Sequence, residues 1–291
     1  MSEAQNGRGP EALALGFFLA FTVLAILGFW NFGLNPGRLP AVDWAVRIYQ
    51  ISFPWFARAH ILISAAVLFF VLTRHARFRW VPAMLAVYLL SFTSEHVGTG
   101  YGIPFSGYEY TGLLGARLLS RVPLVIPLSW FLMSAPAWIL ARHTFPESRQ
   151  WLARILQATF LLVLWDLALD PAMSHLTPYW LWENTGAFYG MPWVNLVGWA
   201  ATGLVLMLTL EALDRRLDWA GTLSWRWALA YYLIVLLMPL GMVTVAGLWW
   251  ATAATLGALA VAWGIHRVFG PGPTRQESRR ALSPTLAEGR S

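Results

Sequence analysis

Cysteine and lysine are both absent from this sequence of 291 residues, and charged residues of all kinds make up only 12% of it. Without cysteine, the chain forms no disulfide and offers no thiolate metal site, iron–sulfur cluster or cysteine nucleophile. The missing lysine leaves arginine as the source of all 20 basic side chains, and we attach no functional weight to that bias. So small a share of charge leaves too little polar surface to cover a soluble globule of this size.

Hydrophobic residues, by contrast, make up 58% of the sequence. They gather in runs that match the roughly 20 residues needed to cross a bilayer core. We therefore predict an all-α fold, a polytopic transmembrane helical bundle of about eight spans. Seven is the alternative, because Arg58 and His60 begin the second run. The eight runs are 12–30, 56–73, 81–97, 122–141, 151–170, 193–212, 227–245 and 248–267.

The arginines predict the orientation of the bundle. With a cytoplasmic N-terminus, fifteen of the 20 arginines fall on the cytoplasmic side, so we expect both termini there and a multi-pass protein of the cell (cytoplasmic) membrane. We predict one integral membrane domain over residues 1–269 and a disordered cytoplasmic tail over 270–291, and we expect the first run to remain as an anchor. The net charge of +6 is scattered along the chain and indicates no nucleic-acid partner.

A decapeptide occurs twice in the sequence. The segment Glu95–Pro104, EHVGTGYGIP, returns as Glu183–Pro192, ENTGAFYGMP, with Glu, Gly, Tyr, Gly and Pro in the same places. In the predicted topology the loops 98–121 and 171–192 both lie on the non-cytoplasmic side. We interpret them as two similar loops of a parallel duplication, folded inward as a lid or cavity wall because irregular backbone at membrane depth needs protein or water around it.

Several ionisable groups fall at the same depth. Asp166 and Asp170 are four residues apart, which places both carboxylates on one helix face, and one of two such groups is expected to keep its proton and serve as a general acid. An ordinary helix end before Pro171 explains Asp170 equally well. Glu95 and His96 end the third run, and His96 is either a proton relay or an interfacial histidine. His60 and Asn195 also lie near this depth.

Aromatic residues make up 15% of the sequence. Most tryptophans fit an interfacial belt. Those beside the repeated segments are candidates to line a pocket for a long apolar substrate, and aromatic faces also stabilise a carbocation. The candidates are Tyr101, Tyr108, Tyr110, Trp165, Trp180, Trp182, Tyr189 and Trp193.

Three stretches resemble a known family. They are SEHVGTGYGIPFSGYEYTGLLGARLLSRVPLVIPLSWFLM, Ser94–Met133; DLALDPAM, Asp166–Met173; and WENTGAFYGMPWVNLVGW, Trp182–Trp199. Together they are similar to the membrane carotenoid-biosynthesis hydratases, the family of the bacterial γ-carotene or lycopene 1′,2′-hydratases and the archaeal bisanhydrobacterioruberin hydratase. The resemblance covers roughly residues 60–250.

The resemblance implies a lyase that adds water, without a cofactor or metal, across the terminal C1′–C2′ double bond of an acyclic ψ end group to give a tertiary alcohol. The implied partners are an acyclic or monocyclic carotenoid, water, the lipid bilayer and other enzymes of the same pathway. Alkene hydration needs an acid, a pocket that tolerates a tertiary cation and a positioned water. Our catalytic candidates are Asp166, Glu95, His96, Asp170 and Glu183. Our substrate-binding candidates are Tyr101, Tyr108, Tyr110, Trp165, Tyr189, Asn195 and His60.

Other classes fit less well. A di-iron carotenoid ketolase or hydroxylase needs clustered histidines, and no two of the six histidines stand at the HxxxH or HxxHH spacing. A flavin desaturase needs a GxGxxG motif after a strand, and this sequence does not supply one. A metal site built from Glu95, His96, Asp166 and Glu183 stays open, although hydration does not require one. The main alternative is a small-molecule or proton-coupled membrane transporter, because intramembrane acids and broken loops are transporter features too.

Overall fold

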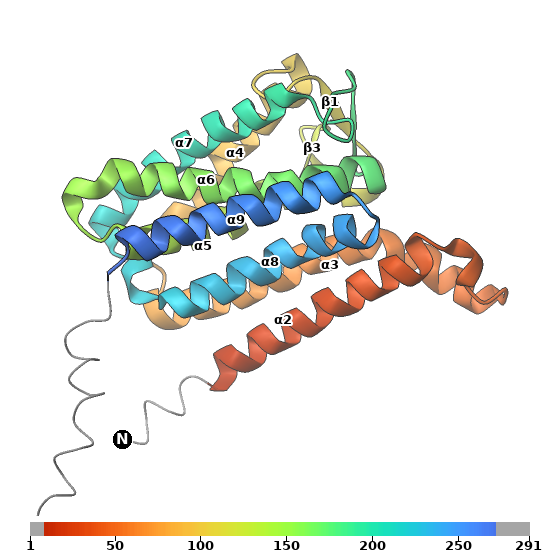
Figure 1. The fold of residues 1–291 in the computed structure, drawn as a ribbon, viewed down its shortest axis with the longest axis horizontal. Coiled ribbons are helices and arrows are strands. Elements are labelled where there is room, and N and C mark those ends of the chain that lie inside the picture. The colour runs from red at the N-terminus through yellow and green to blue at the C-terminus, as the bar shows by residue number, and fades with distance from the viewer. Residues whose placement is uncertain (1–8, 272–291) are drawn as a thin grey trace, which may run out of the picture.

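A computed structural model describes residues 9–271, except for the side chains of residues 53 and 54. Within this part of the chain the fold is a bundle of eight α-helices, α2 to α9 (Figure 1). The all-α prediction is confirmed. The predicted tail lies outside the described residues apart from residues 270 and 271, and the single domain over 1–269 stays a prediction. The helices are Gly9–Gly28, Asp43–Ala76, Val81–Tyr101, Val125–Thr144, Trp151–Asp170, Trp193–Leu217, Trp225–Val245 and Trp249–Phe269.

Six of the helical segments within residues 9–271 are long and apolar enough to cross a membrane. They are Gly9–Gly33, Trp55–Ala76, Val125–Thr144, Ser148–Leu176, Trp193–Leu217 and Trp225–Val245. Helices α4 and α9 occupy the other two predicted ranges with 21 residues each. Polar residues near the end of α4, including Ser94, Glu95 and His96, lower its apolar character. The count of eight spans therefore stays a prediction.

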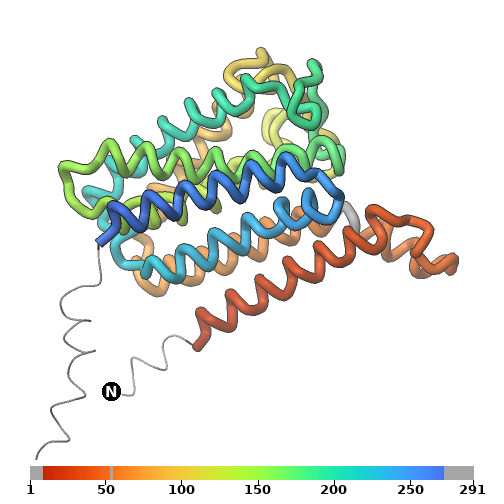
Figure 2. The backbone as a smooth tube through the Cα atoms, in the orientation of Figure 1, coloured from red at the N-terminus to blue at the C-terminus, as the bar shows by residue number. Residues whose placement is uncertain are grey.

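Helix α5 forms the centre of the bundle. It packs against α4, α6 and α8, and 83% of its apolar stretch is buried within the protein. Helix α2 lies at the periphery against α3 and α8, with 28% of its apolar stretch buried. The connection between α2 and the start of α3 projects beyond the rest of the bundle (Figure 2). It contains the π-helix η1, Phe29–Gly33, and the 3₁₀-helix η2, Pro36–Arg38.

The two connections that contain the repeated decapeptide meet at one end of the bundle. Strand β1, Tyr108–Tyr110, pairs antiparallel with β4, Trp180–Trp182, so that Tyr108 lies opposite Trp182. The start of α2 and the end of α9 lie at the opposite end (Figure 1). A smaller pair joins β2, Arg117–Leu118, to β3, Val122–Pro123. The remaining short helices are η3, Gly112–Leu114; η4, Ser148–Gln150; the π-helix η5, Pro171–Leu176; and η6, Ala220–Thr222.

The two copies of the decapeptide have different structures, so the expectation of two similar loops is wrong. The first copy continues α4 to Tyr101 and ends the helix at Gly102, whose φ of +71° lies in the left-handed region that glycine favours. The second copy is an irregular loop with isolated bridges between Gly186 and Gly190. The first copy follows a helix and the second follows strand β4, and these different neighbours decide the local backbone.

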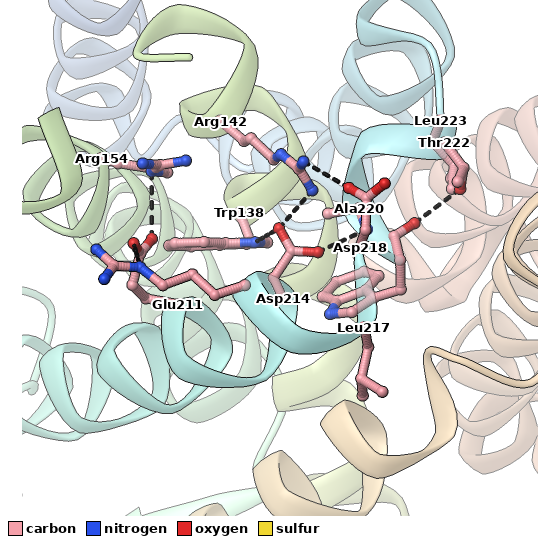
Figure 3. Close-up of polar contacts among 12 residues, drawn as sticks. Trp138, Arg142, Arg154, Glu211, Asp214, Leu217, Asp218, Ala220, Thr222 and Leu223 are labelled. Carbon is pink, nitrogen blue, oxygen red and sulfur yellow. Dashed lines mark hydrogen bonds and ion pairs between the residues drawn. The ribbon is translucent and has the colours of Figure 1, made fainter. Parts of the chain in front are cut away.

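Charged side chains connect α5, α6 and α7 (Figure 3). They lie at the end of the bundle away from β1 and β4 (Figure 1). The buried carboxylate of Asp214 accepts hydrogen bonds from Arg142 at 2.6 Å, from the Trp138 indole at 3.1 Å and from the backbone N–H of Ala220 at 3.0 Å. Arg154 pairs with Glu211 at 3.3 Å. These contacts fix the packing of three helices without involving any of the predicted site residues.

Candidate functional site

A cavity of about 90 Å³ lies where α6 and α7 meet the β1–β4 strand pair. A cavity needs roughly 10–15 Å³ of such space to hold one water, so this one has room for water. Apolar and aromatic side chains form most of its wall, and only a few polar groups face it, which is the usual composition of a small-molecule site. Glu95, Asp170 and Asn195 are among the polar groups in the wall.

Helix α6 brings two carboxylates to this region. Asp166 and Asp170 are fully buried, with exposures of 0% and 1%. Their spacing of four residues places them on one face of the helix, as the sequence predicts. The amide nitrogen of Asn195, in the first turn of α7, lies 3.0 Å from Asp166 Oδ2 and 2.9 Å from Asp170 Oδ2. One buried amide therefore donates to both carboxylates.

The two aspartates differ in their remaining partners. Asp170 Oδ1 accepts hydrogen bonds from Ser174 Oγ at 2.8 Å and from Trp182 Nε1 at 3.2 Å, and Asp170 lines the cavity. Asp166 Oδ1 is buried and has no hydrogen-bond partner within the described part of the chain. Asp170 has three donors that stabilise an anion, whereas Asp166 has one. This asymmetry favours the proton on Asp166 when the pair shares one.

Glu95 forms a second polar cluster across the cavity. Its Oε2 accepts hydrogen bonds from the hydroxyls of Tyr108 and Tyr110, and its Oε1 accepts one from Trp130 Nε1 at 2.8 Å. Glu95 is 4% exposed, so these three donors replace the water that a carboxylate would otherwise need. The arrangement stabilises an anion and leaves the donors fixed around it.

Strand β1 explains how two tyrosines reach the same carboxylate. Successive side chains of a strand point to opposite faces, so Tyr108 and Tyr110 are both buried while Glu109 between them is exposed. Burial and the neighbouring Glu95 carboxylate raise the pKa of both tyrosines well above the ordinary value of 10.0. Both hydroxyls therefore stay protonated, as donors, across the physiological pH range.

Indole rings form the apolar wall. Trp130 and Trp199 stack with ring centres 4.1 Å apart, and Trp165 meets Trp199 edge to face at 5.8 Å. The ring centres of Trp182 and Tyr108 are 5.2 Å apart. All five rings line the cavity. Their electron-rich faces are suited to a positive charge that develops inside it.

Five of the seven predicted substrate-binding residues line this cavity: His60, Tyr108, Tyr110, Trp165 and Asn195. His60 is buried against Phe18, with ring centres 4.9 Å apart, and its Nε2 has no hydrogen-bond partner among the residues that the structure describes. Glu95 and Asp170 also line the cavity, and Asp166 lies one helix turn before Asp170.

The other four predicted residues lie elsewhere, two in the irregular loop of the second decapeptide and two near the end of α4. Glu183 is exposed, beside Gly107 in the strand pair, and Tyr189 accepts a hydrogen bond from the backbone N–H of Trp250. Tyr101 is 80% exposed at the end of α4. His96 packs on Phe92 and does not line the cavity. None of the four side chains makes a hydrogen bond to Asp166, Asp170 or Glu95 among the described residues.

Sequence reasoning missed Trp130, Ser174 and Trp199. Trp130 and Trp199 lie inside long apolar helices, where a tryptophan has no local mark that separates a site residue from a packing residue. Ser174 follows Asp170 by four residues, and this spacing was the available signal. Among residues 9–271 no group of three or more His, Asp or Glu side chains is arranged to hold a metal ion, and exposed Glu183 lies apart from the other three candidates.

Comparison with known proteins identifies similar sequences. The family model described as "Carotenoid biosynthesis protein" matches residues 56–262. Bisanhydrobacterioruberin hydratase from Haloarcula japonica is 32% identical over 130 residues, which cover 44% of this chain and 44% of that protein. The chain thus matches less than half the length of this relative. No solved structure matches significantly.

Proposed function

The chain belongs to the family of carotenoid biosynthesis proteins, and on that premise we propose that it is a carotenoid hydratase. It adds water across the terminal C1′–C2′ double bond of an acyclic ψ end group, of the lycopene or γ-carotene type. The observation that carries this proposal is the buried Asp166–Asp170 pair, bridged by Asn195 at the wall of an aromatic cavity. The site supplies a proton and a cation-tolerant surface, which are the requirements of acid-catalysed alkene hydration.

The aspartate pair is the proton source. Two carboxylates this close to one amide nitrogen repel each other when both are ionised, so the pair holds one proton at neutral pH. Asp170 is the member that lines the cavity, and it delivers the proton to C2′. The double bond breaks, its electron pair forms the new C2′–H bond, and C1′ becomes a tertiary cation. At rest the proton lies on Asp166, which has fewer donors, and it moves to Asp170 on the same amide before transfer to C2′.

The aromatic wall and the Glu95 cluster serve the second half of the reaction. Trp130, Trp165 and Trp199 face the cavity and stabilise the cation at C1′. Water attacks C1′ to form the C–O bond. The excess proton of the adduct then returns to a carboxylate, either the ionised Asp170 or Glu95. The tyrosines on Glu95 orient the attacking water, because their hydroxyl oxygens can still accept its hydrogen bonds.

The direct test is conversion by purified protein. We expect lycopene in detergent micelles to give a product heavier by one water. When the reaction runs in D₂O, one non-exchangeable deuterium should appear on the carbon beside the tertiary alcohol, because a solvent-derived proton adds to C2′. Uptake of a solute by vesicles, with no conversion of lycopene or γ-carotene, would instead support the transporter.

Asp170→Asn tests the proton donor. The amide keeps the shape of the side chain but has no acidic proton, and general acid catalysis contributes about 10²–10⁴-fold. We expect conversion to fall by that factor while protein abundance in the membrane is retained. The matched variant Ser174→Ala removes one hydrogen bond to Asp170 and keeps the carboxylate, so most activity should remain. Near-normal conversion by Asp170→Asn would exclude Asp170 as the acid.

A further inference from the structure

A second and larger cavity lies beside the site. It is a groove of about 570 Å³, within the roughly 300–1,000 Å³ typical of small-molecule pockets. One wall is the end of α2 with the π-helix η1, and another is the first part of α3. The third wall comes from η5 and α8. The first two walls belong to the segment that projects from the bundle in Figure 2.

The groove and the site cavity are neighbours. Ala57, Met173 and Met238 line both. They come from α3, η5 and α8, so three separate elements form the boundary between the two spaces. Two of the three are methionines, whose flexible side chains adapt to the shape of a bound molecule. A chain that lies in the groove therefore reaches the site past side chains that can move aside.

The groove is suited to hydrocarbon. No charged side chain of residues 9–271 lines it. The amide of Asn31, one of its few polar groups, already donates to the backbone oxygen of Leu27. On its outer side Leu24, Trp44 and Ile48 are exposed, so the groove opens toward the surroundings of the bundle. For a protein embedded in a bilayer, this opening faces the lipid in which a carotenoid is dissolved.

We propose that this groove binds the polyene chain of the substrate while its end group occupies the site cavity. The inference rests on the proposed function, and it identifies where the rest of the substrate lies. Continuity through Ala57, Met173 and Met238 selects the substrate's own chain as the occupant over a separate lipid molecule.

In this proposal the site cavity carries out the reaction and the groove selects the substrate. The family match begins at residue 56, whereas most of the two outer walls, from Leu24 to Ser52, precedes it. The residues that carry out hydration lie inside the matched region. We therefore assign selection among carotenoids, by the shape of the chain beyond the end group, to the segment before residue 56.

Ala45→Trp tests the groove. Ala45 is buried in its wall, at 6% exposure, and an indole there would fill the space. Leu13→Trp is the matched control, because Leu13 is 76% exposed on α2 and does not line the groove. Ser52→Phe is a second groove-filling variant, in case Ala45→Trp fails to fold. Each is tested with lycopene and with myrcene, a short hydrocarbon that has the same terminal group.

We expect Ala45→Trp to raise the KM for lycopene about tenfold, equivalent to about 1.4 kcal/mol, and to leave the KM for myrcene nearly unchanged. Leu13→Trp should change neither. Binding is measured separately, by the shift of the lycopene absorption band on titration of Asp170→Asn protein with and without Ala45→Trp. Loss of this shift with Ala45→Trp supports the groove even if the wild-type protein hydrates nothing, which would refute only the proposed function.

Two results would overturn the groove proposal. One is lycopene binding that is equal in the presence and absence of both groove-filling substitutions, as expected if a lipid tail or a second copy of the chain occupies the groove. The other is an equal loss of lycopene and myrcene turnover, which would show that the substitutions disturb the site itself.

Discussion

Glu95 and Asp170 are both buried carboxylates, yet they have different surroundings. Glu95 is held by two phenols and an indole. Asp170 is held by an amide, a hydroxyl and an indole, with a second carboxylate on the same amide. In the proposed mechanism the aspartate pair retains a proton because its two charges would repel, whereas Glu95 is an anion held by three donors. Single side chains of one chemical type thus acquire separate proposed roles from their neighbours.

The role of Glu95 as an acceptor can be tested at one atom. Glu95→Gln replaces one carboxylate oxygen, which accepts hydrogen bonds, with an amide NH₂, which only donates them. At least one buried donor then loses its acceptor, which lowers the stability by about 1–3 kcal/mol. We expect a fall in lycopene conversion of about a hundredfold, together with a lower unfolding temperature in detergent.

Glu109→Gln is the control for that variant, because Glu109 is the exposed residue between the two tyrosines of β1. It should behave as wild type in both measurements. Wild-type conversion by Glu95→Gln would contradict any part for Glu95 in the reaction.

At the scale of elements, close backbone contacts hold the loop over the site. A Cβ at Gly198 of α7 would lie 2.6 Å from Phe105 Cδ1 and 2.7 Å from the Pro104 oxygen. A Cβ at Gly98 of α4 would lie 2.8 Å from the same phenyl ring. The ring of Phe105, which lines the cavity, is therefore held between two helices that can approach it only because both positions are glycine.

Gly198→Ala should consequently disturb the site. We expect a loss of about 1–3 kcal/mol in stability, as for other overpacked positions, and reduced conversion because Phe105 must shift. Gly257→Ala in α9 is the matched control, since a Cβ there meets nothing within 4 Å. That substitution should leave conversion unchanged and slightly raise the unfolding temperature, because alanine is the better helix former. Equal conversion and equal unfolding temperatures of the two variants would refute the close approach of Gly198 to Phe105.

The charged network at the other end of the bundle predicts stability effects without catalytic ones. Arg142 pairs with buried Asp214 and with Asp218, whose side chain is 62% exposed. Breaking a buried pair costs about 3–5 kcal/mol, whereas an exposed pair contributes about 0–1 kcal/mol. Asp214→Asn should therefore lower the unfolding temperature far more than Asp218→Asn. Conversion per folded molecule should stay at the wild-type level for both, and a selective loss with Asp214→Asn would link this end to the reaction.

At the scale of the whole molecule, the absence of cysteine makes orientation measurable. Tyr101 and Leu119 are exposed at the end that carries β1, and Phe78 is exposed in the turn between α3 and α4. We expect a membrane-impermeant maleimide to label Tyr101→Cys and Leu119→Cys in intact cells, and Phe78→Cys only after lysis. The opposite pattern would invert the predicted topology, and labelling of all three in intact cells would contradict the bundle as a spanning structure.

The sequence predicts the parts of this molecule that depend on periodicity and composition. Helical spacing places Asp166 and Asp170 on one face, and apolar runs locate the helices. The first half of α3 does not follow from apolar runs, because Asp43–Ser52 is helical but carries polar residues. The repeated decapeptide led to a wrong prediction of two similar loops. Its first copy, at Glu95, continues a helix, whereas its second copy, at Glu183, follows a strand. Partners brought together by tertiary packing, such as Trp130 with Glu95, have no signal in a single sequence.

The pairing of β1 with β4 constrains the length of the connection between α4 and β1. Tyr108 and Tyr110 reach Glu95 only while β1 keeps its register with β4, because a slip of one residue would turn both tyrosines outward and Glu109 inward. An insertion or deletion of one residue between α4 and β1 would thus remove both phenols from Glu95, although every side chain of the site would still be present. Relatives that share this chemistry should vary in length elsewhere and keep this spacing.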